Sequence, residues 1–402
     1  MEINLYDTCA EDGAYDFLAS RISGAEQSLS FLNDKYNDVY AWRAAGKRRV
    51  AELMFNAPEP EGYDAITIDE TDFGQYTRKT VYFNSAPGPG YTDYAPADAR
   101  AYKDAPRGRR IPAYLLTPKN IIDKAPGVVV LHDHGGMFFW GKDKAVEHKE
   151  DIPQLKNYAR DYYGAPLAST LAKRGYVTLV IDSLYFGERR FKFERHGEFA
   201  PRLNKHEYAS PGYVDEFNAC AREAEGDLAK LFFGAGLTFM GVRAADDIAS
   251  VGYLSSLGCV DPKRIGCIGL SMGGMRSAWL AALDDRVKCA VAVGTMQRYR
   301  EMMAKRLMNY VWLWIIPGLY GEMDYPEAVS LRAPLPLYAM HGKRDGLYPD
   351  NTGEAAIEHI RAVYEKAGAA ENFKYSYYDE EHVFNEAMQT DAFNWMDSYL
   401  KR

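Results

Sequence analysis

The chain has few cysteines, no excess of positive charge and no long apolar run. Its five cysteines are scattered over 402 residues and never form a C-x-x-C pair. This argues against a disulfide framework or a zinc site and favours a reducing, cytoplasmic setting. A net charge of −8 argues against nucleic acid or an anionic membrane as the main partner. The most apolar stretch, Val311–Pro317, is too short to span a membrane.

Targeting signals, repeats and low-complexity tracts are also missing from the sequence. The N-terminus has no basic segment followed by an apolar run, so no signal peptide is expected. Hydrophobic residues make up 47% and charged residues 26% of the chain, which is ordinary for a globular protein. The length is compatible with one large α/β unit.

The N-terminal segment carries an apolar stripe typical of one face of a helix. Apolar residues recur at alternating spacings of four and three, at Leu18, Ile22, Ala25, Leu29, Leu32, Tyr36 and Val39. Gly46 interrupts the pattern, and the proline-containing stretch 56–60 ends it. We therefore expect residues 1–62 to form a helical extension. It either docks on the main domain, which is the commoner outcome, or joins a second copy in a homo-oligomer.

Residues 63–402 show the alternation of an α/β domain. Three short β-like runs come first, at Ala65–Ile68, Lys79–Phe83 and Ile111–Leu116. The later apolar strands are expected at Val128–Leu131, Val177–Ile181, Arg264–Ile268, Val287–Val293, Leu335–Met340 and Phe373–Tyr378. The helices are expected at Pro166–Arg174, Leu237–Leu257, Met272–Leu283 and Thr352–Ala367, and from about Asn385. Continuous apolar strands bounded by helices predict a mostly parallel sheet covered on both faces, with the reactive site at the carboxyl ends of the strands.

Two stretches interrupt this alternation. Residues 183–235 and 296–331 are each too long for ordinary loops, and both are aromatic and charged. Because each follows a strand at its carboxyl end, we expect them to lie over the site as lid-like insertions.

The sequence Gly269-Leu-Ser-Met-Gly273 matches G-x-S-x-G. It directly follows an apolar run and precedes a helical one, as a strand–elbow–helix turn requires. The turn lifts the oxygen of Ser271 clear of the sheet, and bulky residues two positions either side would clash with the neighbouring strand and helix. Ser271 is therefore the predicted nucleophile.

A serine hydroxyl needs a base, and the base needs a carboxylate to fix its tautomer. His382 lies just after the last predicted strand, and Asp345 lies just after the strand before it. The order Ser271, Asp345, His382 is the one that strand–elbow–helix hydrolases use. Asp324, in the second insertion, and Asp379, three residues before His382, are alternative acids.

The negative charge of a tetrahedral intermediate needs N–H donors. We expect one donor to be the backbone amide of Met272, next to the nucleophile at a helix N-terminus. The second should come from the glycine-containing loop His132-Asp-His-Gly-Gly136, with Gly136 as the predicted donor.

The neighbourhood of this loop supplies further candidates. His134 is expected to shape the pocket or the loop, and Phe138, Phe139 and Trp140 are candidates for the acyl or alcohol pocket, with plain packing equally compatible. His132, Asp133 and His134 could hold zinc or iron, but no third ligand follows from the spacing, so no metal is predicted.

Four motifs carry a family resemblance: H-D-H-G-G at 132–136, G-L-S-M-G-G at 269–274, H-G-K-R-D at 341–345 and E-E-H at 380–382. Together they resemble the dienelactone hydrolase and acetyl xylan esterase-like branch of the α/β hydrolases, over about residues 110–402. Residues 181–189 are similar to a D-x-x-x-x-G-E-R stretch of that branch. The resemblance implies an α/β-hydrolase fold with a mostly parallel, eight-stranded sheet, and small acyl esters, often acetyl groups on plant sugars, as substrates. A dienelactone hydrolase proper would carry a cysteine where this chain has Ser271, which favours ordinary ester cleavage.

These observations predict a cofactor-free serine esterase that acts through an acyl-enzyme on small-molecule or carbohydrate-like esters. One alternative is a prolyl-oligopeptidase-like peptidase, which shares the elbow but usually has a large β-rich domain before the hydrolase core. The other is a non-catalytic α/β-hydrolase relative, which usually lacks a triad member.

Overall fold

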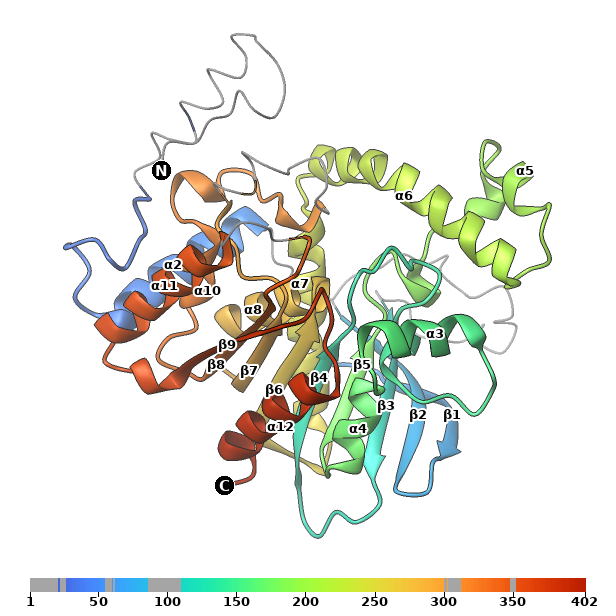
Figure 1. Cartoon of the computed structure of the whole chain (residues 1–402), viewed down its shortest axis with the longest axis horizontal. Coiled ribbons are helices and arrows are strands. Elements are labelled where there is room, and N and C mark those ends of the chain that lie inside the picture. Colours follow the sequence, from blue (N-terminus) through green and yellow to red (C-terminus); the bar gives the residue numbers. More distant parts are fainter. Residues whose placement is uncertain are drawn as a thin grey trace.

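A nine-stranded sheet forms the centre of the computed structural model, which describes residues 21, 27–54, 60, 62–85, 110–299, 302, 312–347 and 352–402 (Figure 1). The strand order is β1-β2-β3-β5-β4-β6-β7-β8-β9. The strands are β1 (Ile66–Asp72), β2 (Tyr76–Asn84), β3 (Arg110–Pro118), β4 (Ala125–Leu131), β5 (Val177–Ile181), β6 (Val260–Leu270), β7 (Val287–Val293), β8 (Leu337–Gly342) and β9 (Phe373–Tyr378).

The six strands β4 to β9 are mutually parallel, and β1, β2 and β3 join them at one edge in antiparallel pairs. Each of the nine runs predicted as strands, three β-like and six apolar, overlaps a strand of this sheet. The family resemblance implied eight strands, which is one too few. The mostly parallel sheet with helices on both faces is confirmed.

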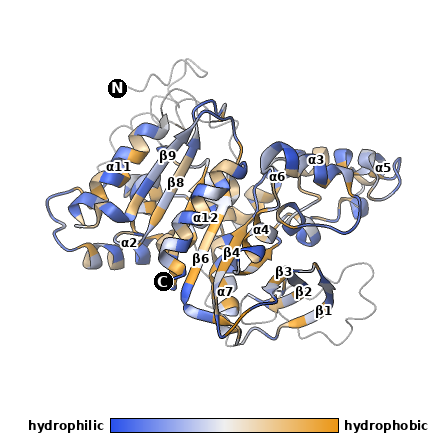
Figure 2. Ribbon diagram, turned by 60° about the horizontal axis from the view of Figure 1, so that its bottom comes forward, coloured by the Kyte–Doolittle hydropathy of each residue, from blue (hydrophilic) through white to orange (hydrophobic). Residues whose placement is uncertain are grey.

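The strands in the middle of the sheet are buried on both faces. In β4, Val129 and Leu131 belong to the apolar cluster under helices α7 (Phe239–Ser256) and α8 (Met272–Leu283). Val128 and Val130 alternate with them and belong to the opposite cluster, under α4 (Leu167–Lys173) and α12 (Glu386–Leu400). Successive strand side chains point to opposite faces, so a continuously apolar strand needs both layers. Figure 2 shows hydrophobic residues concentrated along β4 and β6.

Helix α2 (Val39–Met54) packs the N-terminal extension against the main domain. It runs through Gly46, where the sequence predicted an interruption. A Cβ at that position would overlap the side chain of Leu331. The glycine thus permits close packing, and Trp42 and Val50 on the same helix are fully buried.

The predicted helix over the apolar stripe is wrong for residues 27–38, which form turns and irregular structure. Their polar groups bond to the main domain instead. The amide of Phe31 donates to Glu327 at 2.7 Å, and Lys366 donates to the carbonyl of Phe31 at 2.6 Å. Leu18, Ile22 and Ala25 lie outside the described residues, and association of a second copy through this extension stays a prediction.

Both predicted insertions follow strands at their carboxyl ends. The first, after β5, contains α5 (Ala200–Leu203) and the long helix α6 (Pro211–Gly234). The second, after β7, contains α10 (Tyr325–Ser330). The remaining long helices are α3 (Pro153–Tyr162), which the sequence pattern did not predict, and α11 (Thr352–Lys366).

Within the described ranges, no single helix has the length and apolar composition of a membrane span. The pair α6 and α7 meets that test only when taken together, across a bend of 81°.

Candidate active site

Ser271 stands alone between strand β6 and helix α8. Its backbone has φ 59° and ψ −121°, a conformation that side-chain-bearing residues rarely adopt. Two glycines make room for this turn. A Cβ at Gly273 would overlap the carbonyl oxygen of Leu131, and one at Gly269 would lie 2.5 Å from the carbonyl of Gly273. The strained turn leaves Ser271 partly exposed at the carboxyl edge of the sheet.

His382 and Asp345 form a hydrogen-bonded pair at the same edge. The Nδ1 atom of His382 lies 2.6 Å from Oδ2 of Asp345, whose other oxygen accepts the amide of Leu347 at 3.0 Å. The Asp345 side chain is 1% exposed and that of His382 is 16% exposed. A buried carboxylate on Nδ1 holds the ring with Nε2 as its basic nitrogen.

The imidazole of His382 lies beside the elbow. The amide of Ser271 donates to the carbonyl of Val293 at 2.8 Å, and the next residue, Gly294, lies against the imidazole. A Cβ at Gly294 would come within 3.0 Å of Cε1 and 3.2 Å of Nδ1 of His382, and this residue has φ 62°. Glycine at this position therefore allows the ring to approach the end of β7, next to Ser271.

The two alternative acids have other partners. Asp379 pairs on the surface with Arg344 at 3.0 Å. Asp324 accepts the amides of Tyr299 and Tyr325, each at 2.7 Å, and so caps the start of α10. Of the three carboxylates, Asp345 is the one that the structure pairs with His382.

The two oxyanion donors predicted from the sequence differ in whether another group already accepts a hydrogen bond from the amide. Met272 is the first residue of α8, and its amide is one of those that a helix leaves without an intrahelical acceptor. The amide of Gly136 donates to Nδ1 of His134 at 3.0 Å in this structure, so its assignment as the second donor stays a prediction. The direction of the Gly136 amide is set locally, because Gly135 and Gly136 both have positive φ and fold the loop back onto the His134 ring.

A buried network holds this loop in place. The carboxylate of Asp133 accepts the hydroxyl of Tyr163 at 2.7 Å and that of Tyr158. The ammonium of Lys144 donates to the carbonyls of Asp133 and His134, at 2.7 and 3.2 Å. Burial lowers the pKa of Lys144 to about 8, and the charge of Asp133 partly offsets this. The sequence analysis missed Lys144 and the two tyrosines, since nothing in their spacing indicates a shared partner.

His132 also belongs to the support of the loop. Its Nδ1 bonds to the carbonyl of Asp133 at 2.9 Å, and its Nε2 accepts the amide of Ser183 at 3.1 Å. Burial holds its pKa well below the usual value, so the ring is neutral. With both nitrogens engaged, His132 has no position free for a metal. In the part of the chain that the structure describes, no group of three or more metal-binding side chains is found.

Comparison with known proteins adds the family context. A model described as the prolyl oligopeptidase family matches residues 232–402, which contain Ser271, Asp345 and His382. The chain is 27% identical over 293 residues to "Putative hydrolase YtaP" of Bacillus subtilis (strain 168), a match that spans 72% of this chain and 84% of that protein.

Two solved structures are similar over most of the chain. A "putative acetyl xylan esterase" from Bacteroides fragilis NCTC 9343 has a TM-score of 0.65 at 16% identity, covering 92% of this chain and 83% of that one. The glucuronoyl esterase from Solibacter usitatus has a TM-score of 0.58 at 14% identity, covering 90% and 93%. This chain has an α/β-hydrolase fold.

The D-x-x-x-x-G-E-R stretch joins the first insertion to the segment after the predicted oxyanion loop, residues 132–136. Asp182 accepts the amide and the ammonium of Lys142, at 2.7 and 2.8 Å. A Cβ at Gly187 would overlap the Asp182 carboxylate, and Arg189 pairs with Asp246 at 2.8 Å. The motif is thus a buried scaffold for the loop.

The predicted substrate-binding residues differ in how deeply they are buried. Phe138 is fully buried, with its ring 5.0 Å from that of Phe186 and 4.7 Å from His134, so it packs in the core and lines no open surface. Trp140 is partly exposed, and His134 lies 3.6 Å from Glu225 of α6. Substrate contact by His134 and Trp140 stays a prediction.

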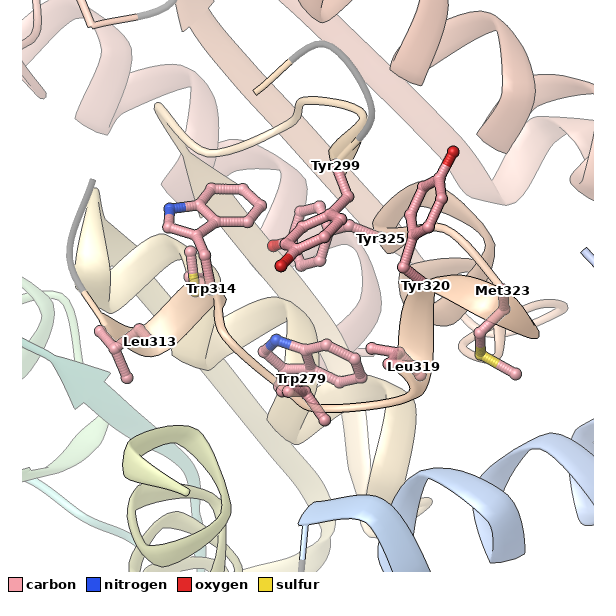
Figure 3. Close-up of a pocket in the computed structure, with 10 residues that line it drawn as sticks. Trp279, Tyr299, Leu313, Trp314, Leu319, Tyr320, Met323 and Tyr325 are labelled. Atoms are coloured by element: carbon pink, nitrogen blue, oxygen red, sulfur yellow. The ribbon is translucent and has the colours of Figure 1, made fainter. Parts of the chain in front are cut away.

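An aromatic cavity lies between the second insertion and α8 (Figure 3). Its wall on α8 is made by Met275 and Trp279, and the amide of Met275 donates to the carbonyl of Ser271 at 2.9 Å. The insertion contributes Tyr299, Leu313, Trp314, Ile316, Leu319, Tyr320, Met323 and Tyr325. The aromatic content noted in the sequence of the insertion therefore surrounds a space one helical turn from the elbow.

The buried residue His341 makes the stability of the protein around this site depend on pH. It is buried, its Nε2 accepts the amide of Met296 at 2.8 Å, and burial lowers its pKa to about 4 despite the nearby charge of Asp345. Between pH 6.5 and 4 the unfolded chain binds a proton that the folded chain excludes, so stability falls as the pH falls through this range. We expect the titration of His341 to lower the free energy of unfolding by roughly 2 kcal/mol between pH 7 and pH 5.

Urea unfolding at pH 7 and pH 5 measures this effect. His341→Gln should lose less stability than the wild type over the same interval, because the amide does not titrate. Equal losses in the two proteins would contradict the assignment.

Proposed function

We propose that this chain, which has an α/β-hydrolase fold, is a serine esterase that cleaves carboxylic esters through an acyl-enzyme. The observation that carries the proposal is the hydrogen-bonded pair of His382 and Asp345 beside the strained elbow of Ser271. Ser271 would attack the carbonyl carbon while His382 takes its proton and then delivers it to the leaving alcohol. Water activated by His382 would release the acid and restore Ser271. The amide of Met272 would donate to the oxyanion.

We propose small acyl groups, acetyl above all, on carbohydrate-like or other small alcohols as the substrates. The sequence motifs resemble the acetyl xylan esterase-like branch, and a protein described as an acetyl xylan esterase shares the fold over most of the chain. We also propose a cytoplasmic setting, which is supported by the free thiols of Cys220, Cys259, Cys267 and Cys289.

A fluorophosphonate probe tests the proposed nucleophile. We expect it to label wild-type protein at Ser271, identified by mass spectrometry of the modified peptide, and to label His382→Ala at a rate lower by orders of magnitude, because only an activated serine reacts quickly. Absence of labelling in the wild type would favour a non-catalytic relative and overturn the esterase proposal.

A peptidase is the second candidate, favoured by the match of residues 232–402 to the prolyl oligopeptidase family. Amide and ester cleavage use the same triad, so substrate preference decides between them. We expect kcat/KM for p-nitrophenyl acetate to exceed that for a panel of aminoacyl p-nitroanilides. The reverse order would replace the esterase by the peptidase.

A further inference from the structure

Helix α6 of the first insertion turns one face toward the oxyanion loop. Asn218, Arg222 and Glu225, at spacings of four and three, all approach residues 134–139. The amide of Phe139 donates to Oδ1 of Asn218 at 3.0 Å, and Glu225 lies 3.6 Å from His134. Figure 1 shows α6 running from the outlying α5 toward α7. This face therefore packs against the loop that follows β4.

Arg222 is the residue of this face that contacts the glycines of the loop. A Cβ at Gly136 would lie 2.5 Å from Nη2 of Arg222, so the guanidinium rests on the backbone of the loop that follows β4. Arg222 is exposed to solvent, and among the described residues it makes no hydrogen bond or ion pair. Its donors are therefore available to a ligand at the loop.

Three other cations of this insertion, including Arg189, pair with carboxylates. Arg202 pairs with Glu216 at 2.6 Å and with Glu223 at 2.7 Å, and Lys230 pairs with Asp227 at 2.8 Å. Among the described residues Arg222 has no such partner, although it lies at the oxyanion loop in a chain whose net charge is −8.

The neighbouring charges do not cancel that of Arg222. Glu225, one turn along α6, is nine-tenths buried and faces His134. Its charge also acts on Arg243, a buried arginine of α7 whose Nε and Nη1 have no hydrogen-bond partner. Arg222, Arg243 and Glu225 together carry a net positive charge beside the loop.

We propose that Arg222 binds an anionic group of the substrate, so that the preferred ester carries a carboxylate a few ångströms from the scissile carbonyl. The inference deepens the proposed function and rests on it. A guanidinium presents its N–H groups as a planar fork that matches a carboxylate. At the rim of the oxyanion loop, this contact would orient the ester over Ser271 and select acidic esters over neutral ones of the same shape.

Matched ester pairs test this inference. One pair carries the charge on the acyl side, monomethyl glutarate against methyl pentanoate, and the other on the alcohol side, 4-acetoxybenzoate against 4-acetoxybenzamide. For wild type, Arg222→Gln, Arg222→Lys and Lys230→Gln, the measured quantity is the ratio of kcat/KM for the acidic ester to that for its neutral partner.

We expect Arg222→Gln to lower this ratio about tenfold or more in at least one pair, since a charge-assisted hydrogen bond is lost. Arg222→Lys should retain part of the ratio. Lys230→Gln, the same charge change on the same helix, should leave it unchanged. A ratio in Arg222→Gln within twofold of wild type in both pairs would overturn the inference while leaving the esterase function in place. If wild type hydrolysed neither neutral ester and resisted the fluorophosphonate, the proposed function would fall, and the inference with it.

Discussion

Alanine at position 271 should lower kcat for p-nitrophenyl acetate by a factor on the order of 10⁴ or more. The substitution removes the atom that would form the acyl-enzyme, and only binding and oxyanion stabilisation would remain. The fold should be unaffected, because the Ser271 side chain makes no capping hydrogen bond to α8. Steady-state kinetics and thermal unfolding of the purified variant measure both expectations.

Ser277→Ala is a matched control on the same helix. Its hydroxyl is buried and bonds to the carbonyl of Gly273 at 2.8 Å, four residues earlier. We expect this variant to keep activity within a few-fold of wild type. Wild-type turnover in Ser271→Ala, with normal unfolding, would remove the basis of the esterase mechanism.

The second large effect is expected at the carboxylate. Asp345→Asn keeps the size of the side chain but removes the charge that fixes the tautomer of His382, so kcat should fall by about 10⁴. The imidazole proton of His382 would then be on Nε2, and this nitrogen could not accept the proton of Ser271. The pair is 2.6 Å apart, and Asp345 is buried, so solvent cannot replace the lost charge.

Asp379→Asn separates this role from that of a nearby charge. Asp379 lies three residues before His382 but pairs with Arg344 on the surface, where an ion pair contributes little. Its variant should be close to wild type in kcat. If instead Asp379→Asn were inactive and Asp345→Asn active, the acid of the triad would have to be reassigned.

Much of the fold could be predicted from local patterns. Strands β5, β7 and β9 and helix α8 have the bounds expected from the sequence, with Met272–Leu283 as the clearest example. Here apolar periodicity and turn residues agree, and tertiary contacts reinforce them. The N-terminal stripe shows the limit of this reasoning, because a spacing of three and four predicts a helix only where backbone groups have no better partner. At Phe31 the backbone amide donates to Glu327, and the carbonyl accepts from Lys366.

The loop after β4 shows why site details escape a pattern. Glycines at 135 and 136 correctly indicate a tight loop, but glycine permits several backbone directions, and the amide of Gly136 is directed to His134. Phe138 is apolar and next to the site, yet it packs into the core with Phe186. Neither outcome depends on residue type alone.

By itself the sequence determined the alternation of strands and helices, the elbow at Ser271 and the order of the serine, carboxylate and histidine. These follow from short-range rules of periodicity, steric room and chain order. Only the tertiary structure decided that Asp345, rather than Asp324 or Asp379, bonds to His382, and that Arg222 of a distant helix rests on the oxyanion loop. Such pairings depend on where side chains far apart in the chain meet in space, and this is set by the packing of the whole domain.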